Sequence, residues 1–140
     1  MYSFDTHARV RYGETDQMGY LYYGNYALYY EVGRVELFRS LGMTYKALEE
    51  EYHTMMPVLS LQQRFVRPAF YDNLLTIRTT IRKMPDQSVT FHHEIFNESK
   101  KLINGGSVRL AFIDTLTGKR VPAPAIFTDK LKPFFEEETK

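Results

Sequence analysis

The sequence predicts an α+β fold in which one strongly curved antiparallel sheet wraps around a long central helix. One segment is apolar on most sides at helical spacing, and about five segments alternate apolar with polar residues. Short turns join consecutive strands, which favours antiparallel pairs and excludes a doubly wound parallel sheet. The 140 residues are expected to form a single domain, residues 1–140, around one hydrophobic core.

The strands are predicted from apolar residues at every second position. The first strand precedes the long helix and the others follow it, at residues 4–12, 57–66, 75–82, 89–96 and 102–114. Gly105 and Gly106 indicate a β-bulge in the last strand. The tail, residues 122–140, is interrupted by prolines, and we expect a short helix near Thr128.

The long helix is expected to follow Asn25, a residue suited to capping it, and to end before Gly42. Gly33 in its middle lowers helix propensity by about 1 kcal/mol, so another backbone is expected to approach closely there. A helix of about 17 residues and strands of about 8 residues have similar lengths, about 25 Å, so a curved sheet can cover the helix. Thr44 is suited to capping a second, short helix.

Composition limits the classes of function. A net charge of +1 argues against nucleic acid as a partner, because phosphate binding requires a basic surplus on one face. With no cysteine, the chain has no disulfide, thiol nucleophile or thiolate metal site. The sequence has neither a signal-peptide pattern nor an apolar run of about 18 residues, so we expect a cytoplasmic protein that does not span a membrane.

The turn before the long helix contains the candidate catalytic group. Asp16 follows the first strand and precedes the glycine turn at Gly19, so its carboxylate can face the start of the helix. Amide groups at a helix start lack intrahelical acceptors and can stabilise an oxyanion. Here they would belong to Tyr23 and Gly24, while Asp16 attacks a carbonyl or deprotonates water. On spacing alone, a turn residue bonded to nearby backbone is the commoner case.

Most of the chain resembles a known family. The hotdog-fold acyl-CoA thioesterases of the 4-hydroxybenzoyl-CoA thioesterase type have an N-terminal motif similar to RYGETDQMGYLYYGNY and the following EVGRVELFRSLG. The similarity continues through PVLSLQQRFVRPAFYDNLLTIRTTI and GSVRLAFIDTLTGKRVPAP. It implies hydrolysis of an acyl-CoA without a cofactor, Asp16 as the catalytic carboxylate and the amide near Tyr23 as the carbonyl-binding group. Many members have His at the Tyr23 position and Gly at the Met18 position, a difference that concerns substrate preference.

Other side chains are expected to bind the substrate. Tyr22, Asn25 and Tyr26 adjoin the expected carbonyl site. Arg82 and Lys83 end a strand and can hold the phosphates of coenzyme A, in a region where the resemblance also suggests such contacts. Weaker candidates for this role are Arg64, Arg67 and Arg109. The acyl group that is accepted depends on which side chains point inward among Tyr22, Tyr23, Tyr26, Met55 and Met56.

Two further sets of polar residues suggest other sites. Glu31 on the long helix is a rival acid, because another branch of hotdog thioesterases has its carboxylate there, but an ion pair with Arg34 is the more expected role. His92, His93 and Glu94 alternate between the two faces of a strand, which argues against a metal site.

Two other functions remain open. The first is a non-catalytic acyl-CoA binding protein with the same tyrosine-lined cleft. The second is a dehydratase acting on acyl-carrier-protein substrates, for which no histidine lies in the motif. An open edge strand predicts a homodimer joined edge to edge, with the cleft lined by both subunits, and the resemblance extends this to a homotetramer.

Overall fold

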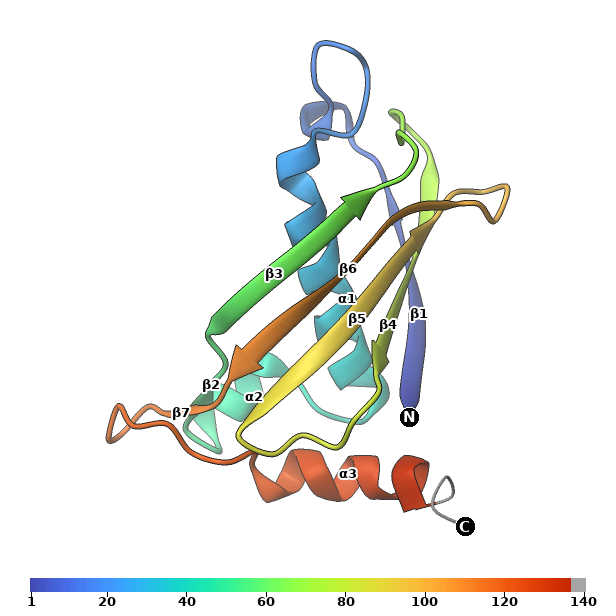
Figure 1. Cartoon of the computed structure of the whole chain (residues 1–140). Helices are drawn as coiled ribbons and strands as arrows, with labels where there is room; N and C mark the ends of the chain where they lie inside the picture. Colours follow the sequence, from blue (N-terminus) through green and yellow to red (C-terminus); the bar gives the residue numbers. More distant parts are fainter. Residues whose placement is uncertain (137–140) are drawn as a thin grey trace.

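The computed structural model describes residues 1–136 and contains the predicted layers (Figure 1). An antiparallel five-stranded sheet, in the order β1-β4-β5-β6-β3, curves around helix α1 (Tyr26–Ser40). Its strands are β1 (Tyr2–Arg9), β3 (Val58–Phe65), β4 (Leu74–Ile81), β5 (Ser88–Phe96) and β6 (Leu102–Ala111). The α+β class and the sheet wrapped around a helix are confirmed.

Smaller elements close the ends of this arrangement. Helix α2 (Tyr45–Glu50) is followed by β2 (Thr54–Met55), which pairs with β7 (Ile113–Asp114). Helix α3 (Ala125–Glu136) crosses one end of the sheet, below the strands in the view of Figure 1. It is longer than the short helix expected near Thr128, and the last four residues of the predicted tail lie outside the described residues. Within residues 1–136, no helix is both long and apolar enough to cross a membrane.

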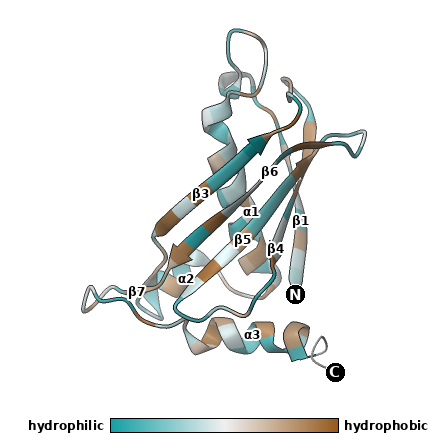
Figure 2. Ribbon diagram, in the orientation of Figure 1, coloured by the Kyte–Doolittle hydropathy of each residue, from teal (hydrophilic) through white to brown (hydrophobic). Residues whose placement is uncertain are grey.

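The hydrophobic core lies between α1 and the inner face of the sheet. Hydrophobic and hydrophilic residues alternate along the strands (Figure 2), and the buried inward residues include Leu75, Ile77, Phe91 and Ile95. From α1, Tyr30, Leu37 and Phe38 are fully buried against them. The other side of α1 is less covered than its apolar composition predicts, because Leu28 and Val32 remain exposed.

Gly33 lets α1 lie close to β4. A Cβ atom at this position would overlap Thr79 Oγ1 and come within 2.9 Å of Ile77 Cγ2. The expected close approach is therefore present, but it involves two side chains of β4 and no second backbone. Thr79 Oγ1 is itself held by His93 Nδ1 at 3.1 Å, so it is not free to move aside.

The bulge expected at Gly105 and Gly106 does not form, and this prediction is wrong. Both glycines pair in register with β3 and with β5. The ladder is irregular elsewhere, between Val58 and Ser60 and between Ile95 and Phe96. Gly106 is required for space, because a Cβ atom there would overlap the Gln62 carbonyl oxygen and lie 2.7 Å from the Tyr30 hydroxyl.

Of the two helix caps predicted from the sequence, one forms and the other does not. Thr44 caps α2 as expected, with its Oγ1 accepting the Ala47 amide at 3.0 Å. Asn25 precedes α1, but its side chain makes no capping bond to the helix and instead donates to the Glu14 carbonyl oxygen. The first predicted strand ends early at Arg9, and Tyr12–Glu14 form a 3-10 turn, η1.

Arg34 points into the core and does not form the expected ion pair. Its side chain is only 6% exposed, and Nη1 lies 3.5 Å from His93 Nε2. Within the described residues, no ion pair joins Glu31 and Arg34, so this prediction is also wrong. Burial, together with the Arg34 and His92 charges, holds the pKa of His93 well below its ordinary value. His93 is therefore a neutral core residue that stacks on the ring of Tyr30.

We predict that Gly33→Ala destabilises the protein. Alanine gains about 1 kcal/mol of helix propensity, but overpacking a core typically costs about 1–3 kcal/mol. Because Thr79 is hydrogen-bonded in place, we expect an overpacking cost of about 2–3 kcal/mol, which leaves a net loss of about 1–2 kcal/mol and a fall in Tm of about 3–8 °C. Thermal unfolding measures the change in Tm. Gly13→Ala is the control, because a Cβ atom there meets nothing within 4 Å. An unchanged Tm for Gly33→Ala would show that the helix–sheet contact is not tight.

Candidate functional site

A closed loop, residues 15–21, positions Asp16 at the start of the central helix. Thr15 and Leu21 form a bridge across its base, and the Asp16 amide donates to the Tyr20 carbonyl oxygen at 2.8 Å. Gly19 has a φ of 80°, a conformation that disfavours side chains. The Leu21 amide also donates to the Ala69 carbonyl oxygen at 2.7 Å. The loop is thus fixed both by its own turn and by the segment between β3 and β4.

The two oxygens of the Asp16 carboxylate differ. Oδ1 accepts the backbone amides of Met18 at 2.9 Å and Tyr20 at 3.1 Å. Oδ2 has no recorded hydrogen-bond partner within residues 1–136. Asp16 therefore is the turn residue that its spacing suggests, yet the turn uses one oxygen and leaves the other free for chemistry.

Two free backbone amides lie where the helix begins. Residues Tyr23–Asn25 form a 3-10 turn, η2, that leads directly into α1. The Asn25 amide donates to the Tyr22 carbonyl oxygen, whereas no acceptor is recorded for the amides of Tyr23 and Gly24 in the described part of the chain. Unpaired amides at a helix start carry partial positive charge and favour a bound anion or oxyanion.

A cavity of about 320 Å³ connects the carboxylate to the helix start. It is lined by Asp16, Met18, Tyr20, Leu21, Tyr23, Tyr26, Phe65, Val66, Arg67 and Pro68. The Phe65 ring packs edge-to-face on Tyr26 and Tyr23, with centroids 5.5 and 6.3 Å apart. Asp16, which keeps one carboxylate oxygen without a hydrogen bond, thus lines a mostly aromatic and apolar hollow.

Tyr22 and Tyr26 remain protonated at neutral pH. Burial raises the pKa of Tyr26 above its ordinary value. The neighbouring Tyr23 hydroxyl raises the pKa of Tyr22, and the charge of Asp16 acts in the same direction. These phenols can therefore donate hydrogen bonds or exclude water, but they do not serve as bases near pH 7.

The structure brings only some of the expected site residues together. Asp16, Tyr23 and Tyr26 line one cavity, but Tyr22 does not, and its ring lies against Gly24 and Tyr23. The Asn25 side chain is bound to the Glu14 carbonyl oxygen at 2.9 Å. Met55 and Met56 line a different apolar cavity of about 310 Å³ between α2 and β2. Glu31 is exposed on α1.

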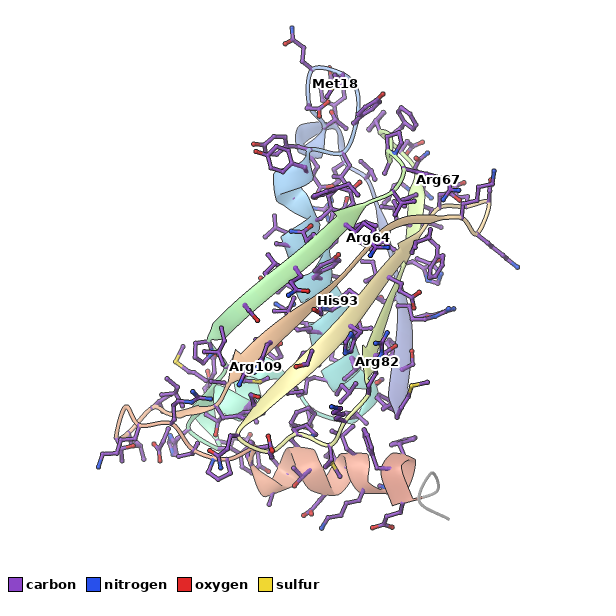
Figure 3. All side chains as sticks on the ribbon, in the orientation of Figure 1. Met18, Arg64, Arg67, Arg82, His93 and Arg109 are labelled. Carbon is purple, nitrogen blue, oxygen red and sulfur yellow. The ribbon has the colours of Figure 1, made fainter. Side chains whose placement is uncertain are left out.

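Arg82 and Lys83 directly follow β4, and neither lines the Asp16 cavity. Figure 3 shows Met18 at the tip of its loop, with Arg64 and Arg82 successively farther down the molecule. A polar cavity of about 350 Å³ includes Val66, Arg64, Arg82 and the two glycines of β6. It shares Val66 with the Asp16 cavity, and it shares Arg82 with a further cavity that includes Lys83.

Sequence reasoning gave no role to Glu14, whose hydrogen bonds surround the site. Its Oε1 accepts the Tyr29 hydroxyl at 2.7 Å, and its carbonyl oxygen accepts the Tyr22 amide at 2.9 Å. The available signal was a second acid close to Asp16, together with a tyrosine in the first turn of a buried helix.

Known proteins share both this sequence and this fold. A family model described as the thioesterase-like superfamily matches residues 10–131. The acyl-CoA thioester hydrolase YbgC of Escherichia coli is 30% identical over 124 residues, covering 89% of this chain and 92% of that protein. The structure of DHNA-CoA thioesterase from Staphylococcus aureus superposes with a TM-score of 0.88 and 30% identity, covering 99% of this chain and 93% of that one.

A third relative is only 21% identical, which is too low to support more than the fold. It is a mutant 4-hydroxybenzoyl-CoA thioesterase complexed with 4-hydroxybenzoyl-CoA, with a TM-score of 0.81 and coverage of 93% of this chain and 96% of that chain. The family and the hotdog fold expected from the sequence are confirmed. The match over residues 10–131 shows that the chain belongs to the thioesterase-like superfamily.

Proposed function

We propose that this protein hydrolyses an acyl-CoA to the free acid and CoA, acting as a single hotdog domain with Asp16 as its catalytic carboxylate. The enzyme class, thioester hydrolase, is supported by the names of the relatives. The observation that carries the role of Asp16 is that this residue lines an aromatic cavity together with Tyr23 while its Oδ2 makes no hydrogen bond within residues 1–136. A cytoplasmic location stays a prediction.

The chemistry needs only the groups already described. The thioester carbonyl oxygen would accept the amides of Tyr23 and Gly24, which stabilise the charge that develops on it during attack. Asp16 Oδ2 either attacks the carbonyl carbon, giving an acyl-aspartate anhydride that water then hydrolyses, or removes a proton from an attacking water. In both routes the C–S bond breaks and CoA leaves as a thiolate.

The leaving group explains why one carboxylate suffices. A thiol has a pKa of about 8.5, so the thiolate departs without a strong general acid. Tyr23 and Tyr26, with Phe65, would bind the acyl group and keep water from the cavity except at the attacking position. Tyr22 would cover the mouth beside Gly24, and Asn25 would contribute through its bond to Glu14.

Arg82 and Lys83 would bind the phosphates of coenzyme A. Val66 lines both the Asp16 cavity and the separate polar cavity whose lining includes Arg64, Arg82, Gly105 and Gly106. Neither arginine has a recorded ion pair within the described residues, so both charges are available to an anion. This sequence of hollows would let the pantetheine arm run from the cleft to the phosphate-binding pair.

The site would be completed by a second copy of the chain. β3 is an edge strand, and of its eight residues only Gln63 is not exposed. Leu61 and Phe65 on its inner face are 42% and 52% exposed, so the protomer leaves apolar surface uncovered beside the cleft. Pairing of β3 with its copy would remove the open edge and cover Phe65, a residue of the Asp16 cavity. We propose a homodimer of this kind, with a homotetramer as its possible extension.

A non-catalytic acyl-CoA binding protein is the alternative that one observation favours. The bonds from Met18 and Tyr20 to Asp16 Oδ1 give this carboxylate a structural role without any reaction. Saturable binding of acyl-CoAs, with no thiol released from aliphatic or aromatic thioesters, would establish it. The dehydratase has no such support, because no histidine lines the Asp16 cavity in the described residues.

We predict that Asp16→Asn abolishes hydrolysis without unfolding the protein. The amide oxygen can accept the same two backbone amides, but the amide nitrogen cannot attack or act as a base. The expected loss in kcat/KM is about 10²–10⁴-fold, with little change in Tm. Thiol release from a panel of acyl-CoAs measures the loss in kcat/KM. Asp114→Asn is a matched control, because Asp114 Oδ1 holds Leu116 and Thr117 amides in a similar turn. Equal rates for Asp16→Asn and the parent would remove Asp16 from the mechanism.

We predict that the double variant Arg82→Ala, Lys83→Ala raises KM for acyl-CoA and leaves kcat unchanged. Each lost charge-assisted bond to phosphate is worth about 1.5–3 kcal/mol, so KM should rise at least about tenfold. The same variant should bind acyl-pantetheine, which lacks the nucleotide, as the parent does. Arg78→Ala is the control for loss of a cation elsewhere, on β4, since Arg78 pairs with Asp5 on β1. An equal rise in KM for both substrates would contradict a phosphate role.

We predict that Leu61→Asp disrupts a dimer formed along β3. A charge on the inner face of an edge strand opposes pairing with a second edge. Light scattering should give a dimeric or larger mass for the parent and a monomeric mass for the variant. Leu116→Asp, at an exposed leucine outside the sheet, should keep the parent's mass. A monomeric parent at micromolar concentration would contradict the shared cleft.

A further inference from the structure

Glu14 has no role in the chemistry proposed above, although it ends η1 just before the Asp16 loop. Its side-chain Oε1 accepts the Arg11 amide at 2.9 Å and the Tyr29 hydroxyl at 2.7 Å. Tyr29 is a buried residue of α1, only 3% exposed, so it is a fixed point on the helix. These bonds tie the segment that leads to Asp16 onto the central helix.

The backbone of the same residue reaches the other half of the site. The Glu14 carbonyl oxygen accepts the Tyr22 amide and Asn25 Nδ2, each at 2.9 Å. Tyr22 directly precedes the free amides of Tyr23 and Gly24, and Asn25 directly follows them. One residue therefore holds both ends of the segment that contains the expected oxyanion amides.

We propose that Glu14 is the positioning residue of this site, fixing the distance between the Asp16 carboxylate and the amides of Tyr23 and Gly24. The inference rests on the proposed hydrolysis and adds to it the residue that sets its geometry. Catalysis requires reacting atoms to be held about 3–3.5 Å apart, and a misplacement of about 1 Å can cost about 100-fold in rate. A residue that touches no substrate can therefore control kcat.

Tyr29 is suited to be the permanent donor in this arrangement. Burial raises its pKa above the ordinary value for tyrosine, and the hydrogen bond to Glu14 raises it further. The phenol keeps its proton throughout the pH range in which the enzyme would work, so the bond to the carboxylate persists.

The experiment compares two pairs of variants in the full chain. Tyr29→Phe removes only the hydroxyl bonded to Glu14. Tyr2→Phe is its matched control, because the Tyr2 hydroxyl also joins β1 to α1, through Ser40 at the opposite end of the helix. Glu14→Ala removes the acceptor, and Glu14→Gln keeps an amide oxygen that can accept the same donors.

The expected result is a loss in kcat with KM preserved. Glu14→Ala and Tyr29→Phe should lower kcat by about 10–100-fold while KM stays within about threefold, because binding groups are untouched. Glu14→Gln should recover most of the rate, since a neutral acceptor still makes the two bonds. Tyr2→Phe should keep the parent's kcat. A merely structural bond would lower Tm equally in both tyrosine variants and leave kcat alone.

Amide hydrogen exchange tests the same bonds without substrate. Protection of the Tyr22 amide should fall in Tyr29→Phe and not in Tyr2→Phe. If the parent is active, Asp16→Asn is inactive and Tyr29→Phe matches Tyr2→Phe in both assays, the positioning role alone is overturned. If the parent releases no thiol, the proposed hydrolysis and the positioning role both fall.

Discussion

Helix α1 lies so close to the sheet that neither Gly33 nor Gly106 leaves room for a methyl group. This contact fixes where the helix starts, because a helix pinned at its middle cannot shift along the strands without steric overlap. The start of α1 then meets the rim of the sheet, where η2 leaves its amides unpaired. The position of those amides is therefore set by the helix–sheet contact at Gly33 and Gly106, which is distant from them in the sequence.

The loop at residues 15–21 is built onto that fixed end. Its bonds to Ala69 on one side and to Tyr29, through Glu14, on the other hold it between the β3–β4 connection and the helix. Asp16 has Oδ1 bonded inside the turn and Oδ2 free for the proposed reaction. A carboxylate held in this way needs little reorganisation before it reacts, which is the physical advantage of placing it in a tight turn.

Sequence reasoning was most successful where the relevant signal is local. Alternation along β4 and β5 predicted which residues face the core, and the expected turn at Asp16–Gly19 is present, while the catalytic role of Asp16 stays a prediction. Gly33 indicated a close contact, but not that Thr79 and Ile77 fill it, because their pairing with the helix depends on the whole sheet. The Glu31–Arg34 pair was expected from helical spacing, but the Arg34 side chain is buried in the core beside His93 instead.

The residues that were missed depend on contacts between distant parts of the chain. The Glu14–Tyr29 bond joins residues 15 apart and passes from a turn to a helix, so no period or spacing rule predicts it. The exposure of β3 has a similar origin. Its sequence alternates like a half-buried strand, yet α1 contacts its inner face at Phe65 through Tyr26 and still leaves Leu61 and much of Phe65 for another surface to cover.

The central claim is that a thioester carbonyl sits between the Asp16 carboxylate and the amides at the start of α1. A crystal structure with an acyl-CoA analogue whose sulfur is replaced by a methylene group tests it most directly. The account predicts the carbonyl oxygen within hydrogen-bonding distance of the Tyr23 or Gly24 amide, and Asp16 Oδ2 about 3–3.5 Å from the carbonyl carbon or bridged to it by one water. An analogue whose carbonyl lies outside this cavity, with Asp16 facing bulk solvent, would contradict it.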